Sequence, residues 1–141
     1  MNKINAHVHR YTHVIQETSL DSFGHVNHSA YLTLLEEARW DWITKNGYGL
    51  HVIKETGLGP TILSLDLKFS RELHARDKVV IETHMNAYEK KIGRIFQRVV
   101  RDGVVCCEAN FVIGLFCMTK RKLVLPTSAW LRAVGIEQDK E

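Results

Sequence analysis

A carboxylate and a glycine stand directly before the start of a predicted helix. Asp21 precedes Gly24 by three residues, in the run Leu20-Asp21-Ser22-Phe23-Gly24-His25-Val26-Asn27-His28-Ser29-Ala30-Tyr31. The first N–H groups of a helix lack partners within it and attract negative charge, including charge that develops on a polarised carbonyl oxygen. The segment therefore combines a base or nucleophile with backbone N–H groups that can polarise a carbonyl. This combination predicts chemistry on an acyl group.

The same run resembles the hotdog-fold thioesterases, in particular the acyl-CoA hydrolases similar to 4-hydroxybenzoyl-CoA thioesterase. Members of that family end their first strand in Asp-x-x-Gly-x-Val, often followed by Asn-(Asn/His)-x-x-Tyr. Their central helix carries a Glu-x-Ala-Arg segment, which here is Glu36-Glu37-Ala38-Arg39. The resemblance covers nearly the whole chain in the order and length of its elements, and its specific motif is confined to residues 21–39.

The resemblance implies hydrolysis of an acyl-CoA thioester to a free acid and CoA, without a cofactor. Asp21 then acts either as general base on a water or as nucleophile that forms a mixed anhydride, and the residues leave both roles open. The backbone N–H of His28, at the helix start, is expected to polarise the carbonyl. The positions expected to bind substrate are Gly24, His25, Val26, Asn27, His28, Tyr31 and Glu36.

Each of these residues also has a purely structural interpretation. Asp21 is a turn residue if its side chain accepts hydrogen bonds from its own backbone, and Gly24 then serves a conformation that a Cβ forbids. Glu36 is the alternative base, since a helix carboxylate is the catalytic group in a related branch of the family. Otherwise it pairs with Arg39 at i, i+3. Tyr31 is most simply a core residue.

A non-catalytic module that binds acyl-CoA or acyl-carrier protein is the second functional hypothesis. Such a module keeps the fold and the free N–H groups at the helix start but does not turn substrate over. The retention of Asp21 favours the enzyme. A dehydratase of the same fold requires a His near a Pro-Gly pair, and here Pro60 follows its glycine, so that activity is not predicted.

His25 and His28 beside Asp21 raise the question of a metal site. A histidine pair at i, i+3 that straddles a helix start does not reliably direct both rings at one ion, and no further His or Cys lies nearby in the sequence. We therefore expect no metal site. Polar lining of the cleft is the expected role of both imidazoles, with His25 in a position to tune the charge of Asp21.

The period of the hydrophobic pattern changes once along the chain. A first strand is predicted over residues 7–18, and one face of an amphipathic helix over residues 29–46, with Asn27 or Ser29 as N-cap. A loop with one short helical turn follows over residues 48–60. The remaining elements are strands over residues 61–70, 78–88, 92–101 and 104–119 and a helix over residues 127–134. This order predicts an α+β hotdog fold, in which an antiparallel five-stranded sheet wraps around one long central helix.

Length and composition fit one folded domain over residues 1–141. The net charge is +3 with neutral histidines, and no dense block of Lys and Arg points to nucleic acid. Basic residues that are candidates for the CoA phosphates, with surface solvation as the default, are Arg71, Lys90, Lys91 and Arg94. Residues 1–14 lack the apolar segment of a signal peptide, and no apolar run is long enough to cross a membrane. The three cysteines, an odd number, fit buried thiols in a reducing cytoplasm.

The predicted architecture leaves apolar surface to cover. A single sheet around a single helix exposes its outer face and its edges, so we expect at least a homodimer. The resemblance implies the same, since hotdog domains join their sheets edge to edge and often pair again into tetramers. The reaction cleft is then shared between two subunits.

Overall fold

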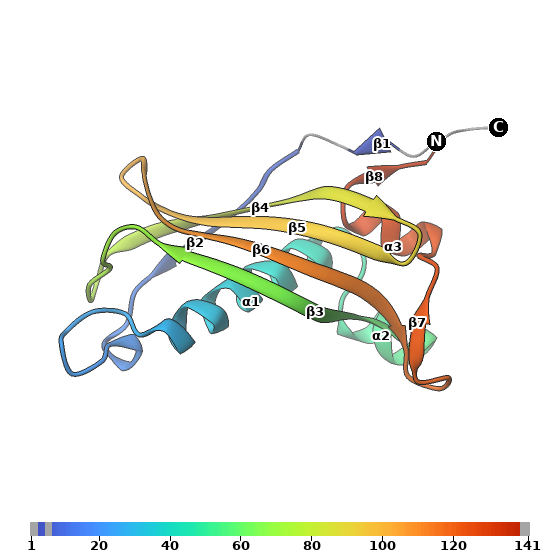
Figure 1. Cartoon of the computed structure of the whole chain (residues 1–141), viewed down its shortest axis with the longest axis horizontal. Helices are drawn as coiled ribbons and strands as arrows, with labels where there is room; N and C mark the ends of the chain where they lie inside the picture. Colours follow the sequence, from blue (N-terminus) through green and yellow to red (C-terminus); the bar gives the residue numbers. More distant parts are fainter. Residues whose placement is uncertain (1–2, 5–6, 139–141) are drawn as a thin grey trace.

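One antiparallel sheet crosses one long helix in the computed structural model, which describes residues 3–4 and 7–138 (Figure 1). The strand order is β2-β4-β5-β6-β3, and β7 pairs with β6. The strands are β2 (His9–Val14), β3 (Leu58–Phe69), β4 (Lys78–Glu89), β5 (Ile92–Arg101), β6 (Val104–Cys117) and β7 (Lys122–Val124). The long helix is α1 (His28–Lys45). The expected α+β class and the five main strands around a central helix are confirmed, and β7 is a sixth strand that was not predicted.

Smaller elements complete the described chain. They are the strand pair β1 (Lys3–Ile4) and β8 (Ile136–Glu137), the 3₁₀ turn η1 (Glu17–Ser19), and the helices α2 (Leu50–Thr56) and α3 (Ser128–Ala133). Gly57 ends α2 in the left-handed region at φ 71°, and β3 begins directly after it, earlier than expected. Pro60 lies inside β3, which is tolerated because β3 is an edge strand.

The first strand is shorter than the expected residues 7–18. It ends at Val14, and the backbone of the next residue, Ile15, pairs with the loop before β4 instead of with a strand. Its N–H donates to the Asp77 carbonyl over 2.9 Å, and its own carbonyl accepts from the Arg76 N–H over 2.7 Å. This pairing turns the chain toward α1.

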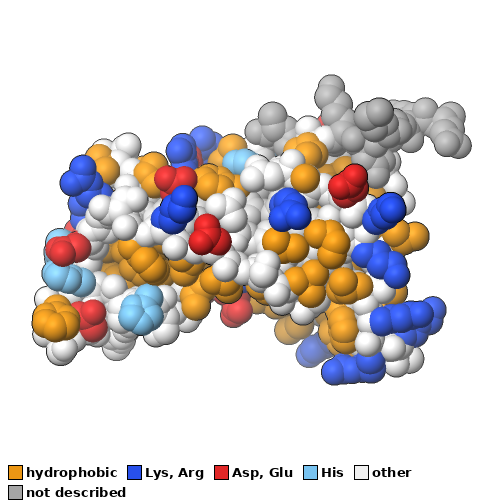
Figure 2. Space-filling model, viewed as in Figure 1, with side chains coloured by type: hydrophobic (Ala, Val, Ile, Leu, Met, Phe, Trp, Pro, Cys, Tyr) orange, Lys and Arg blue, Asp and Glu red, His pale blue; other side chains and the backbone are white. Residues whose placement is uncertain are grey.

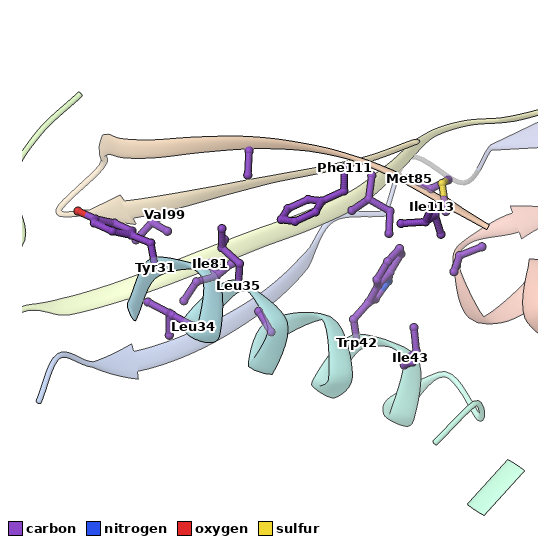
Figure 3. Packing of buried hydrophobic residues seen from close by; sticks show 14 of the residues in the cluster. Tyr31, Leu34, Leu35, Trp42, Ile43, Ile81, Met85, Val99, Phe111 and Ile113 are labelled. Atoms are coloured by element: carbon purple, nitrogen blue, oxygen red, sulfur yellow. The ribbon is translucent and has the colours of Figure 1, made fainter. Parts of the chain in front are cut away.

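Helix α1 buries the face that its sequence period predicts. Asn27 is the N-cap, and its side-chain oxygen accepts from the Ala30 N–H over 2.8 Å. The buried residues of α1 are Tyr31, Leu34, Leu35, Ala38, Trp42 and Ile43. Figure 3 shows Tyr31, Leu35 and Trp42 directed at the sheet. They belong to one buried cluster with Ile81, Val99, Phe111 and Ile113. The helix start is thereby fixed against the rigid core.

A buried polar link also joins α1 to the sheet. Gln97 of β5 is fully buried, and its amide nitrogen donates to the Leu35 carbonyl and to Thr83 Oγ1, each over 3.0 Å. Its amide oxygen accepts from Arg39 Nη1 over 2.9 Å. The guanidinium also lies 4.3 Å from the centre of the Phe111 ring. Burial lowers the pKa of Arg39 to about 10, so the group stays charged at neutral pH.

The edge strand β3 shows apolar residues that the protomer does not cover. Leu65 and Phe69 are opposite the buried Phe111 and Cys107 of β6, and therefore lie on the helix side of the sheet. Yet Leu65 is 47% exposed and Phe69 is 53% exposed. Helix α1 does not reach far enough to cover this face.

Two further features concern the cysteines and the helices. Cys106, Cys107 and Cys117 are buried free thiols, and burial raises the pKa of Cys107 to about 11. The sulfur atoms therefore serve as apolar packing in β6. Among the described residues, no helix has the length and the apolar composition needed to cross a membrane.

Candidate active site

The Asp-x-x-Gly segment forms a tight turn before α1. Leu20 and Val26 form an isolated antiparallel bridge, and Asp21 donates its N–H to the His25 carbonyl over 2.8 Å. The Gly24 N–H donates to the Asp21 carbonyl over 3.1 Å, and Gly24 has φ +80°. A residue with a Cβ is strained in that conformation, which confirms the conformational reason for this glycine. Open space surrounds the position where its Cβ would lie.

The Asp21 carboxylate is anchored by the same turn. Its Oδ1 accepts the backbone N–H of Phe23 over 2.9 Å and that of His25 over 3.4 Å. The local hydrogen bonding expected of a turn residue is therefore present. Within the described part of the chain, these hydrogen bonds reach Oδ1 alone. Oδ2 stays available to a water or to a substrate carbonyl.

The carboxylate and the helix start open into one cleft with a volume of about 290 Å³. Its lining residues are Asp21, His25, Val26, His28, Tyr31, Phe69, Ser70, Arg71 and Glu72. The N–H groups of the first helical residues have no acceptor within the helix, and Asn27 caps the one at Ala30. The backbone of His28 therefore presents a donor at the positive end of the α1 dipole.

Tyr31 forms an apolar wall of this cleft. Its ring is almost fully buried and packs edge-on against Phe69 of β3, with ring centres 5.1 Å apart. Burial raises the pKa of Tyr31 to about 12. The phenol is therefore neutral near neutral pH, where it can donate a hydrogen bond.

The cleft brings together five of the eight residues expected at the site, namely Asp21, His25, Val26, His28 and Tyr31. Gly24 shapes the turn behind it. The Asn27 side chain is engaged at the helix cap, where its oxygen accepts from Ala30 N and Ser29 Oγ.

Glu36 lies elsewhere. It lines a separate, smaller cavity of about 110 Å³ with Arg39, Trp40 and Ile62. Glu36 is exposed to solvent. The Arg39 guanidinium donates to Gln97, and the negative charge of Glu36 acts to raise the Arg39 pKa. Within one subunit, Glu36 and Asp21 therefore face different cavities.

The far wall of the cleft comes from the end of β3 and the residues after it. Phe69, Ser70 and Glu72 were not predicted at the site, whereas Arg71 was a candidate for the CoA phosphates. The other basic candidates, Lys90, Lys91 and Arg94, line a groove at the β4–β5 turn. Figure 2 shows several Lys and Arg side chains at that end, and His side chains at the end with the turn before α1.

Comparison with known proteins places this chain in a family. A family model described as the thioesterase-like superfamily matches residues 15–134. The chain belongs to the thioesterase-like superfamily. The sequence-based predictions of a thioesterase and of the hotdog fold are both confirmed.

One curated relative and two solved structures are similar to this chain. The chain is 25% identical over 109 residues to the long-chain acyl-CoA thioesterase FadM of Escherichia coli, covering 75% of this chain and 82% of FadM. A 1,4-dihydroxy-2-naphthoyl-CoA thioesterase from Synechocystis superposes with a TM-score of 0.82 at 14% identity, over 91% of this chain and 96% of that one. A hypothetical protein from Staphylococcus aureus, solved in complex with CoA, has a TM-score of 0.85 at 12% identity, over 95% and 85% of the two chains. These two structures share the fold.

Proposed function

We propose that this thioesterase hydrolyses an acyl-CoA thioester to the free acid and CoA in the cleft before α1. The observation that carries the proposal is that the Asp21 carboxylate and the N-terminus of α1 line the same cleft. The name of the relative FadM and the CoA bound to the Staphylococcus aureus structure support CoA as the leaving group.

The proposed mechanism divides the work between backbone and side chain. The thioester carbonyl oxygen accepts the N–H of His28, and the positive end of α1 stabilises the negative charge that develops on it. Asp21 then acts in one of two ways. As general base it takes a proton from a water that attacks the carbonyl carbon, and the C–S bond breaks to release CoA. As nucleophile it forms a mixed anhydride with loss of CoA thiolate, and water then cleaves the anhydride.

We further propose that the working enzyme is at least a homodimer joined through β3. This strand is the open edge of the sheet, and three of its large side chains, Leu63, Leu65 and Phe69, are between 46% and 53% exposed. An exposed apolar edge strand is a pairing surface. Phe69 also lines the cleft, so a partner seated on β3 extends the cleft wall.

The compartment is part of the same proposal. The three cysteines are free and buried, and the chain has no disulfide among the described residues. Thiols persist in reducing compartments. We therefore keep the cytoplasm as the proposed location.

The decisive experiment replaces the carboxylate without changing its shape. Asp21→Asn retains an oxygen that accepts the Phe23 N–H, so the turn is expected to survive. We expect hydrolysis of a panel of acyl-CoA substrates to fall by at least about 100-fold, the scale for losing a general base. The matched control is Glu36→Gln, which neutralises the alternative carboxylate. Near-normal turnover of folded Asp21→Asn would overturn the assignment of Asp21. An inactive Glu36→Gln would then make Glu36 the base.

A further inference from the structure

Two histidines and a glutamate converge beside the cleft. His25 Nε2 lies 3.1 Å from Glu72 Oε2, and His74 Nε2 lies 3.7 Å from the same oxygen. One ligand atom from each of the three side chains lies within 4.8 Å of the other two. The two imidazole rings meet edge to face with centres 5.6 Å apart. All three side chains reach solvent.

The backbone explains why residues so distant in sequence meet. The Val26 N–H donates to the Leu73 carbonyl over 3.1 Å, which fixes the turn before α1 against the loop after β3. Val26 and Leu73 are both buried. In extended backbone, neighbours of a buried residue point away from the core. His25 precedes Val26, and Glu72 and His74 flank Leu73, so the three side chains emerge on one side.

The chemistry of this set matches a borderline transition-metal cation. Imidazole nitrogen and carboxylate oxygen are ligands that Zn²⁺ accepts, and three protein ligands leave a fourth position for water. Metal–ligand distances of about 2.0–2.2 Å in a tetrahedral site place ligand atoms about 3.3–3.6 Å apart. The observed 3.1 and 3.7 Å bracket that range. We propose that His25, Glu72 and His74 form a binding site for Zn²⁺ or a similar divalent cation at the edge of the cleft.

A fourth residue lies behind one of the ligands. Asp77 Oδ2 lies 3.7 Å from His74 Nδ1, on the ring nitrogen opposite the one that faces Glu72. The same carboxylate oxygen accepts the His74 backbone N–H over 2.8 Å and Arg101 Nη1 over 3.0 Å. A carboxylate behind the second nitrogen is the usual support of a metal-binding histidine. The loop after β3 therefore presents Nε2 of His74 toward the cation.

The expectation of no metal site considered a different pair. It rested on His25 and His28, and His28 is not in the cluster that the structure forms. His74 takes that place, because the β3–β4 connection folds back onto the turn before α1 (Figure 1).

Zn²⁺ titration of the purified, metal-free protein tests the site directly. We expect one Zn²⁺ per chain to bind in isothermal titration calorimetry, and Co²⁺ to give the visible spectrum of a site with mixed nitrogen and oxygen ligands. His74→Gln and Glu72→Gln are each expected to weaken binding by about 100-fold or more, at least the loss that follows removal of an outer-sphere partner. His28→Gln is the matched control, because it changes a histidine of the same cleft outside the cluster and should bind as the wild type does.

Thermal unfolding supplies a second readout that does not depend on activity. Zn²⁺ that binds only the folded state raises the unfolding midpoint, and we expect this rise for wild type and His28→Gln but not for His74→Gln. The three cysteines are present in every variant, so binding by thiols cannot produce the difference. Absence of one-to-one binding by wild type, or equal binding by His74→Gln and wild type, would overturn the proposal. Both measurements stand even if the proposed hydrolysis fails.

Discussion

Gly24 controls where the Asp21 carboxylate points. The turn closes through the Gly24 N–H to the Asp21 carbonyl, and it requires φ +80° at the glycine. Because a Cβ at this position would meet no neighbouring atom within 4 Å, the constraint is the backbone conformation rather than space. Substitutions at Gly24 are therefore expected to change the direction of the Asp21 carboxylate, not the packing of the core.

Gly24→Val should lose far more activity than His28→Asn. A β-branched residue is strongly disfavoured at positive φ, at a cost of about 1–2 kcal/mol or more, so the turn reopens and Asp21 moves. His28→Asn keeps the backbone N–H that is proposed to polarise the carbonyl. Both variants should stay folded by circular dichroism while kcat/KM differs sharply between them.

A third variant separates conformation from side-chain bulk. Asn tolerates the left-handed region better than other residues with a Cβ, so Gly24→Asn should retain more activity than Gly24→Val. If His28→Asn abolishes turnover while Gly24→Val is tolerated, the imidazole takes part in the reaction, and polarisation of the carbonyl by the backbone N–H is the wrong explanation.

The site was predictable where it is contiguous in the chain. Asp21, Gly24 and the helix start lie within a few residues of each other, so their spacing alone brings them to one turn. Phe69 and Glu72 enter the cleft through the register of β3 and the hydrogen bond from Val26 to Leu73, which no local pattern encodes. The convergence of His74 on His25 has the same origin.

At the scale of elements, the position of α1 depends on one buried amide. Gln97 joins two neighbouring strands and the helix through Thr83, the Leu35 carbonyl and Arg39. The Arg39 charge is largely buried, and its recorded hydrogen-bond acceptor is Gln97. Removal of that acceptor leaves a largely buried guanidinium without this hydrogen bond, which costs more than the hydrogen bond itself.

Gln97→Leu should therefore destabilise the protein by about 1–3 kcal/mol. Arg39→Met in the same background removes the charge that has lost its hydrogen-bond acceptor, so the double variant should recover part of the lost stability. Urea unfolding of wild type, both single variants and the double variant gives the coupling energy between the two residues. Additive effects would show that Arg39 does not depend on Gln97.

Strand periodicity predicted which side chains share a face but not whether that face is covered. In β6 the alternation and the burial agree, since Ala109, Phe111 and Ile113 are all buried. In β3 the register shifts between Ile62 and Ser64, and Leu65 stays half exposed although it is opposite the buried Phe111. The difference is position in the sheet, because β6 lies between two strands under α1 and β3 lies at the edge.

At the scale of the whole molecule, β3 is the surface that a second subunit should cover. It is twelve residues long, and its outer edge has no partner strand among the described residues. Leu65 lies near its middle, on the same side as the core, and is 47% exposed. A long apolar edge strand is a surface for pairing, so we predict that another copy of the chain covers it.

Leu65→Lys should convert the assembly to monomers. A charge that points inward on an edge strand opposes edge-to-edge pairing, and natural proteins use this device for that purpose. Light scattering after size exclusion, at micromolar concentration, should show a dimer or tetramer for wild type and a monomer for Leu65→Lys. The matched control is Val104→Lys, since Val104 is 45% exposed but lies at the β5–β6 turn and pairs with Arg101 of β5 instead of with β3. The rate of hydrolysis by Leu65→Lys should fall together with its molecular mass in solution, because Phe69 of the same strand lines the cleft. A wild-type protein that is monomeric and fully active would refute both the β3 interface and the shared cleft.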